Sequence, residues 1–230
     1  MMRRTAGCLR SLLVLLFVVL ILPLRAADND GLLDSFLDAQ KKVQTWSAEF
    51  VQTRTTKALV RPTTAKGRVW FSAPNQFRWE LGNPPQTIAV RRSNEMLIIQ
   101  PRLKRVEKYP LDAKAAGQWK DMMAILDSGF PRERAALESQ FKIISVVVTD
   151  GKAEVVLQPK SSSARKMMPL FKIGFSTKDF SMTSTEMQFG DATETMRNDF
   201  EKPKVNEALD EQLFSPVIGT DYKVTEPLKK

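Results

Sequence analysis

The sequence has 230 residues, a formal net charge of +9, one cysteine and no histidine. Without histidine the chain lacks the side chain that most often performs acid–base catalysis or binds a metal, and a lone cysteine cannot form an internal disulfide. Lysine and arginine are interspersed with acidic residues and form no basic stripe, so nucleic acid is not an expected partner.

The N-terminal residues have the three-part layout of a secretory signal peptide. Three arginines precede an uninterrupted apolar run over 12–22, and the small residue Ala26 follows a proline shortly after it. The run is shorter than the roughly 18 to 20 apolar residues that span a bilayer. We therefore predict a cleaved signal peptide at 1–26 and one exported domain over 27–230, with an uncleaved N-terminal anchor as the alternative. Cleavage would also remove Cys8.

An amphipathic helix is predicted over 30–43, where apolar residues recur at helical spacing. Gln40 interrupts the apolar face of this helix. After the helix the period changes to two, because apolar residues from Trp46 to Phe50 alternate with polar ones. This alternation predicts a half-buried strand over 46–55.

The stretch 67–79 concentrates four aromatic side chains on two strand-like runs that are joined by the turn signal Pro74-Asn75. In the second run Phe77 and Trp79 alternate with charged or polar residues, so one face of that strand is apolar. Two roles remain open for these aromatic residues at the level of sequence. They either fill the protein core or line a ligand site.

The rest of the chain is expected to be mainly strands separated by turn residues. Strands are predicted at 87–91, 96–100, 104–109, 141–149, 153–159, 170–175, 180–189, 193–200 and 222–225, helices at 118–127 and 131–139, a helical turn at 206–213, and a polar loop at 160–166. Asp150-Gly151 is the strongest hairpin signal. About ten strands in meander order must curl or close. The predicted fold is mainly β (α+β), a curled antiparallel sheet that forms an incomplete barrel, with helices closing its concave side.

Catalytic and metal-binding patterns are weak. The pairs Ser139-x-x-Lys142 and Ser163-x-x-Lys166 both match the serine–lysine pattern of acylating enzymes, but the partner motifs are missing. The sequence also has no Gly-rich phosphate loop and no calcium-binding loop. We therefore predict a protein that is not an enzyme and has no metal or cofactor, and keep a hydrolase of envelope lipids only as a third hypothesis.

Several segments together resemble the LolA-type outer-membrane lipoprotein carrier family. They are AEFVQ at 48–52, GRVWF at 67–71, PNQFRW at 74–79 and PPQ at 84–86, after a signal peptide and an amphipathic helix. The resemblance implies an incomplete antiparallel barrel in the periplasm, closed by helices. It also implies a protein that carries acyl chains in a cavity and moves lipid-modified proteins from the inner to the outer membrane without chemistry. The implied partners are an inner-membrane lipoprotein-releasing transporter or lipid exporter and an outer-membrane acceptor, and the expected state is a monomer.

The sequence departs from the best-known carriers of this family at two positions. Ala73 stands where those carriers have an arginine, before the proline that is Pro74 here, and their arginine is tied to accepting cargo. Gln40 replaces an apolar residue on the first helix. These departures leave the implied fold and apolar cavity intact, and they suit relatives whose cargo is another lipid or glycolipid.

The sequence therefore predicts a periplasmic carrier of acyl chains, and the alternative is a non-catalytic envelope sensor or regulator of the same fold that binds a protein partner. The residues predicted to line the lipid-binding cavity are Phe50, Val69, Phe71, Phe77, Trp79, Ile88, Val90 and Ile98. The residues predicted to form a lid are Leu33, Phe36, Leu37, Met122 and Met123.

Overall fold

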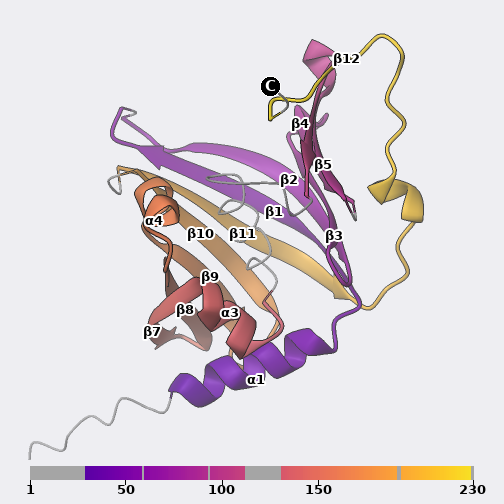
Figure 1. Ribbon diagram of the computed structural model, residues 1–230. Coiled ribbons are helices and arrows are strands. Elements are labelled where there is room, and N and C mark those ends of the chain that lie inside the picture. The colour runs from indigo at the N-terminus through magenta and orange to yellow at the C-terminus, as the bar shows by residue number, and fades with distance from the viewer. Residues whose placement is uncertain (1–28, 59, 93, 112–130, 191–192, 229–230) are drawn as a thin grey trace, which may run out of the picture.

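The computed structural model describes residues 29–58, 60–92, 94–111, 131–190 and 193–228 (Figure 1). The predicted signal peptide and the predicted helix at 118–127, with Met122 and Met123, lie outside these residues. Among the helices described, none is long and apolar enough to cross a membrane.

Strands dominate the described chain. The elements are α1 (Asn29–Lys41), β1 (Thr45–Thr56), β2 (Thr63–Ser72), β3 (Gln76–Leu81), β4 (Thr87–Arg91), β5 (Glu95–Gln100), η1 (Pro101–Leu103), β6 (Arg105–Pro110), α3 (Arg134–Gln140), β7 (Phe141–Thr149), β8 (Lys152–Pro159), α4 (Ser162–Met167), β9 (Phe171–Ser176), β10 (Met182–Phe189), β11 (Glu194–Val205), η2 (Glu211–Phe214) and β12 (Lys223–Thr225).

All the strands belong to one 12-stranded sheet in the order β12-β6-β5-β4-β3-β2-β1-β11-β10-β9-β8-β7. The sheet consists of two meanders, β1–β6 and β7–β11, which are joined where β1 pairs antiparallel with β11. Strands β7 and β12 end the order, so the sheet curls without closing, and α1 lies across one end of it (Figure 1). The predicted fold class is confirmed. The predicted single meander is corrected, because β1 pairs with β11 and β12 pairs parallel with β6.

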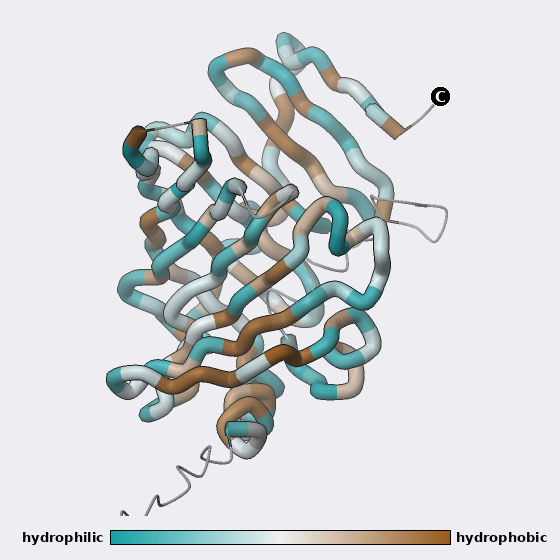
Figure 2. Tube along the Cα trace, turned by 90° about the vertical axis from the view of Figure 1, so that its left-hand side faces the viewer, coloured by the Kyte–Doolittle hydropathy of each residue, from teal (hydrophilic) through white to brown (hydrophobic). Residues whose placement is uncertain are grey.

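The main core lies on the inner face of the sheet, which we define as the face that carries Phe50 and Trp79. Hydrophobic and hydrophilic residues alternate along several strands (Figure 2), and such strands turn their apolar side chains mainly to one face. The stacked rings of Phe36 and Phe175, whose centroids are 4.4 Å apart, pack α1 onto β9. Members of this core include Leu33, Phe36, Leu37, Trp46, Phe50, Val69, Phe71, Phe141, Val155, Leu157, Met168, Phe171, Ile173, Phe175 and Met182.

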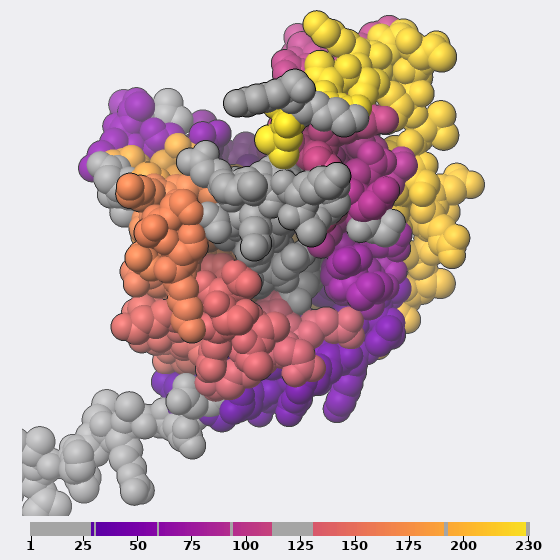
Figure 3. All heavy atoms as spheres, in the orientation of Figure 1, coloured from indigo at the N-terminus to yellow at the C-terminus, as the bar shows by residue number. Residues whose placement is uncertain are grey.

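A second apolar cluster lies on the outer face of β4–β6. It contains Val90, Leu97, Ile99 and Val106, with Ile88, Ile218 and Tyr222 packed against it. The last two belong to residues 206–225, which we name the C-terminal strap. This strap runs along the outside of the sheet beside β3–β6 (Figure 3) and ends as β12. A hydrogen bond from the Arg78 guanidinium to the Leu213 carbonyl (3.1 Å) and an ion pair of Lys104 with Asp221 (2.5 Å) hold it there.

Local sequence signals explain most element boundaries. Asp150 and Gly151 both adopt positive φ in the β7–β8 hairpin, as the Asp-Gly signal requires. The prediction of a polar loop at 160–166 is wrong, because α4 occupies most of this segment. The Ser161 hydroxyl accepts a hydrogen bond from the Ala164 amide, and Ala164 is buried, so a capped turn of helix forms there.

Candidate functional site

The strand register gathers the aromatic residues of β1, β2 and β3 on the inner face. Across the three strands, Trp46 lies beside Phe71 and Phe71 beside Phe77. One residue pair further from α1, Ala48 lies beside Val69 and Val69 beside Trp79. Directly opposed side chains on neighbouring strands are in contact range, so these rows form a continuous apolar wall.

Gly67 permits the closest contact in this wall. It lies opposite Phe50 on β1, and the Phe50 ring covers it to reach Trp79 on β3, with ring centroids 4.0 Å apart. A Cβ at residue 67 would come closer than 3.0 Å to both the Phe50 ring and the backbone oxygen of Glu80. Glycine is therefore the residue that lets an aromatic side chain lie flat across β2.

Strand β3 is buried in an unusual way. Its outward residues Arg78 and Glu80 are charged, yet only 14% and 7% of their side-chain surfaces are exposed, because they pair at 2.7 Å and Glu80 also binds Arg68 at 2.8 Å. Its inward residues Phe77 and Trp79 are large and apolar, yet they are only half-buried. Large apolar side chains are normally the more completely buried ones. The inner face of β3 therefore presents apolar surface that the described protein does not fully cover.

The structure brings six of the eight predicted wall residues to one face. The inner face carries Phe50, Val69, Phe71, Phe77 and Trp79. Ile98 lies on the same face, because Ala89 on β4 is paired with Trp79 on one side and with Ile98 on the other.

Ile88 and Val90 do not belong to this wall. They lie opposite Glu80 and Arg78, on the outer face, where they pack in the cluster beneath the C-terminal strap. Ile88 and Val90 thus pack as apolar residues, but against the C-terminal strap and not in the inner wall.

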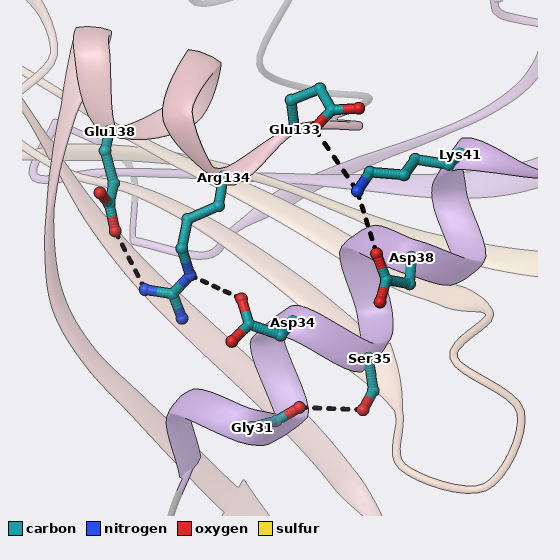
Figure 4. A network of polar contacts seen from close by, with 8 residues as sticks. All are labelled: Gly31, Asp34, Ser35, Asp38, Lys41, Glu133, Arg134 and Glu138. Carbon is teal, nitrogen blue, oxygen red and sulfur yellow. Dashed lines mark hydrogen bonds and ion pairs between the residues drawn. The ribbon is translucent and has the colours of Figure 1, made fainter.

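The predicted lid residues Leu33, Phe36 and Leu37 all lie on the apolar face of α1 and are buried in the main core. Charged contacts hold the solvent side of α1 to α3 and the segment before it (Figure 4). Arg134 binds Asp34 of α1 at 2.6 Å and Glu138 of α3 at 3.0 Å, and Lys41 lies 3.4 Å from Glu133. The carboxylates of Asp34 and Glu138 raise the pKa of Arg134 against the opposing effect of desolvation. Lid movement itself remains a prediction.

Gln40, which interrupts the apolar face of α1, has a structural partner. Its side-chain amide is buried and donates a hydrogen bond to the Phe180 carbonyl at 3.2 Å. Phe180 has positive φ in the turn before β10, so Gln40 ties the helix to that turn.

Sequence reasoning did not find a group of three polar side chains on the inner face. Gln52 on β1, Asn198 on β11 and Thr185 on β10 lie beside one another and are all buried. Gln52 donates to the Asn198 oxygen at 3.0 Å, and Asn198 donates to the Thr185 hydroxyl at 3.2 Å. The only available signal was that Gln52 continues the period of two that places Trp46, Ala48 and Phe50 inward.

The described residues offer little for covalent chemistry or metal binding. Within them, no three histidine, cysteine or carboxylate side chains gather closely enough to hold a metal ion. The Ser139 hydroxyl donates to the Ala136 carbonyl of its own helix, and the Ser163 hydroxyl bonds with Ser161. The arrangement as a whole is suited to apolar binding.

The described chain thus forms a curled, open and mainly antiparallel sheet with an aromatic inner wall and a helix across one end. The family model for the outer membrane lipoprotein carrier protein LolA matches residues 41–217. This match covers most of the chain, and the chain therefore belongs to the LolA family.

Two curated relatives are named outer-membrane lipoprotein carrier protein. The protein from Dechloromonas aromatica is 28% identical over 204 residues, which cover 87% of this chain and 90% of the relative. The protein from Chromohalobacter salexigens is 30% identical over 95 residues, and that match spans 41% of this chain and only 45% of the relative's length. An uncharacterized conserved protein from Thermus thermophilus shares the fold with a TM-score of 0.50 at 11% identity, covering 86% of this chain and 98% of that one.

Proposed function

We propose that this chain is a periplasmic carrier that holds acyl chains of lipoproteins or related lipids against its inner face and ferries them towards the outer membrane. The observation that carries this proposal is the unusual burial of β3, where the large apolar residues Phe77 and Trp79 are only half-buried while the charged Glu80 of the same strand is buried. Membership of the LolA family supports the same function.

Binding by area burial is strong enough for such a carrier. Each methylene group transferred from water to an apolar surface contributes about 0.8 kcal/mol, so one acyl chain is held well without a covalent bond. Because the contact is non-directional, the chain is released to any acceptor that covers it better. In this account Phe50, Val69, Phe71, Phe77, Trp79 and Ile98 contact the acyl chain, and α1 closes one end of the site through Leu33, Phe36 and Leu37.

The proposal also includes export by the signal peptide at 1–26, one mature domain over 27–230, and transient contact with an inner-membrane transporter or exporter and an outer-membrane acceptor. Ala73 is half-buried at the edge of the main core, beside the α1 end of β1, and its amide donates to the Gln44 carbonyl at 2.8 Å. An arginine at residue 73 would therefore stand at that same end. The variant Ala73→Arg tests the cargo class, because a gain of lipoprotein transfer would indicate a lipoprotein shuttle that lacks only this contact.

Native mass spectrometry of the gently purified protein tests the proposed function. We expect a bound species with the mass of a lipid or lipid-modified protein. We also expect micromolar binding of a fluorescent acyl probe, weakened at least tenfold by Trp79→Ser.

The matched control is Trp70→Ser, since Trp70 is half-buried on the neighbouring strand but faces outward beneath the Arg68 guanidinium. A protein that carries no lipid and does not bind acyl probes would refute the proposal. Recovery of an inner-membrane regulatory protein without lipid would instead favour the sensor alternative.

A further inference from the structure

The buried side chains of Gln52, Asn198 and Thr185, which we name the amide relay, lie side by side on the inner face of β1, β11 and β10. Phe50 and Phe200 lie opposite each other on β1 and β11, and the next inward pair in both strands is Gln52 with Asn198. Thr185 extends the row onto β10. The pair beyond is Arg54 with Met196, and Arg54 binds Glu194 at 2.5 Å.

Along β1 and β11 the inner face therefore becomes more polar with distance from α1. The aromatic rows lie nearest α1, the amide relay follows, and a charged pair of Arg54 and Glu194 stands at the far end. This order matches an amphiphile that enters with its acyl tails towards α1. The groups that join the tails to the rest of the lipid would then lie at the depth of the relay.

The relay has unused hydrogen-bond donors. Its two internal bonds run in one direction, from Gln52 to Asn198 and from Asn198 to Thr185. Within the described part of the chain these side chains make no further hydrogen bond. Each amide thus keeps a second N–H, and the Thr185 hydroxyl keeps its hydrogen, because its oxygen acts as acceptor. A buried polar group that uses only part of its hydrogen-bonding capacity is costly, so these remaining hydrogens favour a ligand that supplies acceptor oxygens.

On the β2 side the relay adjoins a small side chain. The residue opposite Gln52 on β2 is Ala65. Strand β3 ends at Leu81, which lies opposite Gly67, and therefore adds no residue beside Ala65.

We propose that the amide relay recognises the ester carbonyl oxygens of an acylated glycerolipid, and thereby sets how deep the acyl tails enter. This inference rests on the proposed carrier function and adds the chemistry that the site selects. A lipid whose tails are joined by ester bonds binds more tightly than one of equal length whose tails are joined by ether bonds, since an ether lacks the carbonyl oxygen.

The test compares dioctanoyl phosphatidylglycerol with its di-O-octyl ether analogue, both measured by displacement of N-phenyl-1-naphthylamine. The reporter itself has no carbonyl group. For the unmodified protein we expect the ester lipid to bind roughly tenfold more tightly than the ether lipid, as two net hydrogen bonds would give. Thr185→Val keeps the side-chain shape and removes the hydroxyl, and Gln52→Met removes the first amide.

Each variant should reduce the preference for the ester to less than about threefold and leave affinity for the ether lipid within about twofold. Thr195→Val is the matched control, because Thr195 is half-buried on β11 but faces outward, and it should keep the full preference. Equal affinity of the unmodified protein for both lipids would overturn the inference while leaving the carrier function intact. Loss of folding stability in the variants with an unchanged preference would assign the relay a purely structural role and overturn it too. Failure of both lipids and the reporter to bind would overturn the carrier function together with the inference.

Discussion

Gly67 provides a sharp test of how the inner wall is built. In Gly67→Ala the new methyl group would lie closer than 3.0 Å to the Phe50 ring and to the Glu80 backbone oxygen. The ring can rotate away only by giving up its contact with Trp79, and the carbonyl is fixed because β3 is paired with both β2 and β4. Overpacking of this kind costs about 1 to 3 kcal/mol, and the lost aromatic contact about 1 kcal/mol more.

We therefore expect Gly67→Ala to lower the free energy of unfolding by about 3 kcal/mol, a large part of the roughly 5 to 15 kcal/mol typical of a domain. Urea unfolding followed by circular dichroism measures this change. Gly31→Ala is the matched control, because Gly31 lies in α1 and a Cβ added there would have no atom within 4 Å. The control should gain about 0.5 to 1 kcal/mol from helix propensity. If the free energy of unfolding of Gly67→Ala lies within about 0.5 kcal/mol of that of the unmodified protein, the close packing of Phe50 over β2 is incorrect.

Two further predictions concern charge and pH. Arg134→Gln removes the ion pairs with Asp34 and Glu138, and because these groups are partly exposed, the free energy of unfolding should fall by only about 0.5 to 1 kcal/mol. Amide hydrogen exchange should become faster in α1. Adding Asp34→Asn to this variant should change the exchange rate little further, because the two residues act through the same ion pair. Burial and a hydrogen bond to the Glu107 carboxylate raise the pKa of Tyr109 to about 12. Since the folded-state pKa lies above the unfolded one, this stabilisation is complete below about pH 10 and is lost as the pH rises towards 12. Urea unfolding at about pH 9 and pH 11 measures this loss. The free energy of unfolding should fall less between the two pH values in Tyr109→Phe than in the unmodified protein.

Much of the fold could be predicted from local patterns. The change from helical period to period two after residue 43, the turn at Pro74-Asn75 and the Asp150-Gly151 hairpin all correspond to observed boundaries. Local patterns carry no information on which distant strands pair, so the contact of β1 with β11 was not predictable. Helix α4 was missed because its six residues are mostly polar, and its stability comes from the Ser161 cap and the burial of Ala164.

The candidate site was predictable only in part. Trp46, Phe50, Phe77 and Trp79 follow from alternation once the register is known, but alternation alone does not say which apolar face turns inward. On β4 the prediction that Ile88 and Val90 line the inner wall failed. The C-terminal strap buries the outer face there, and both residues face the strap. The amide relay escaped prediction because polar residues on a strand normally face solvent, and only the pairing of β1, β11 and β10 places these three together.

The central claim is that acyl chains lie against the inner face of β3. Two single-tryptophan proteins test it, one that keeps only Trp79 and one that keeps only Trp70, with phenylalanine at the other tryptophan positions. These residues lie on neighbouring strands and face opposite sides of the sheet. We predict that phosphatidylglycerol with brominated acyl chains quenches the fluorescence of Trp79 in proportion to bound lipid and leaves Trp70 unquenched. Equal quenching of both, or quenching of Trp70 alone, would contradict an acyl-binding inner face.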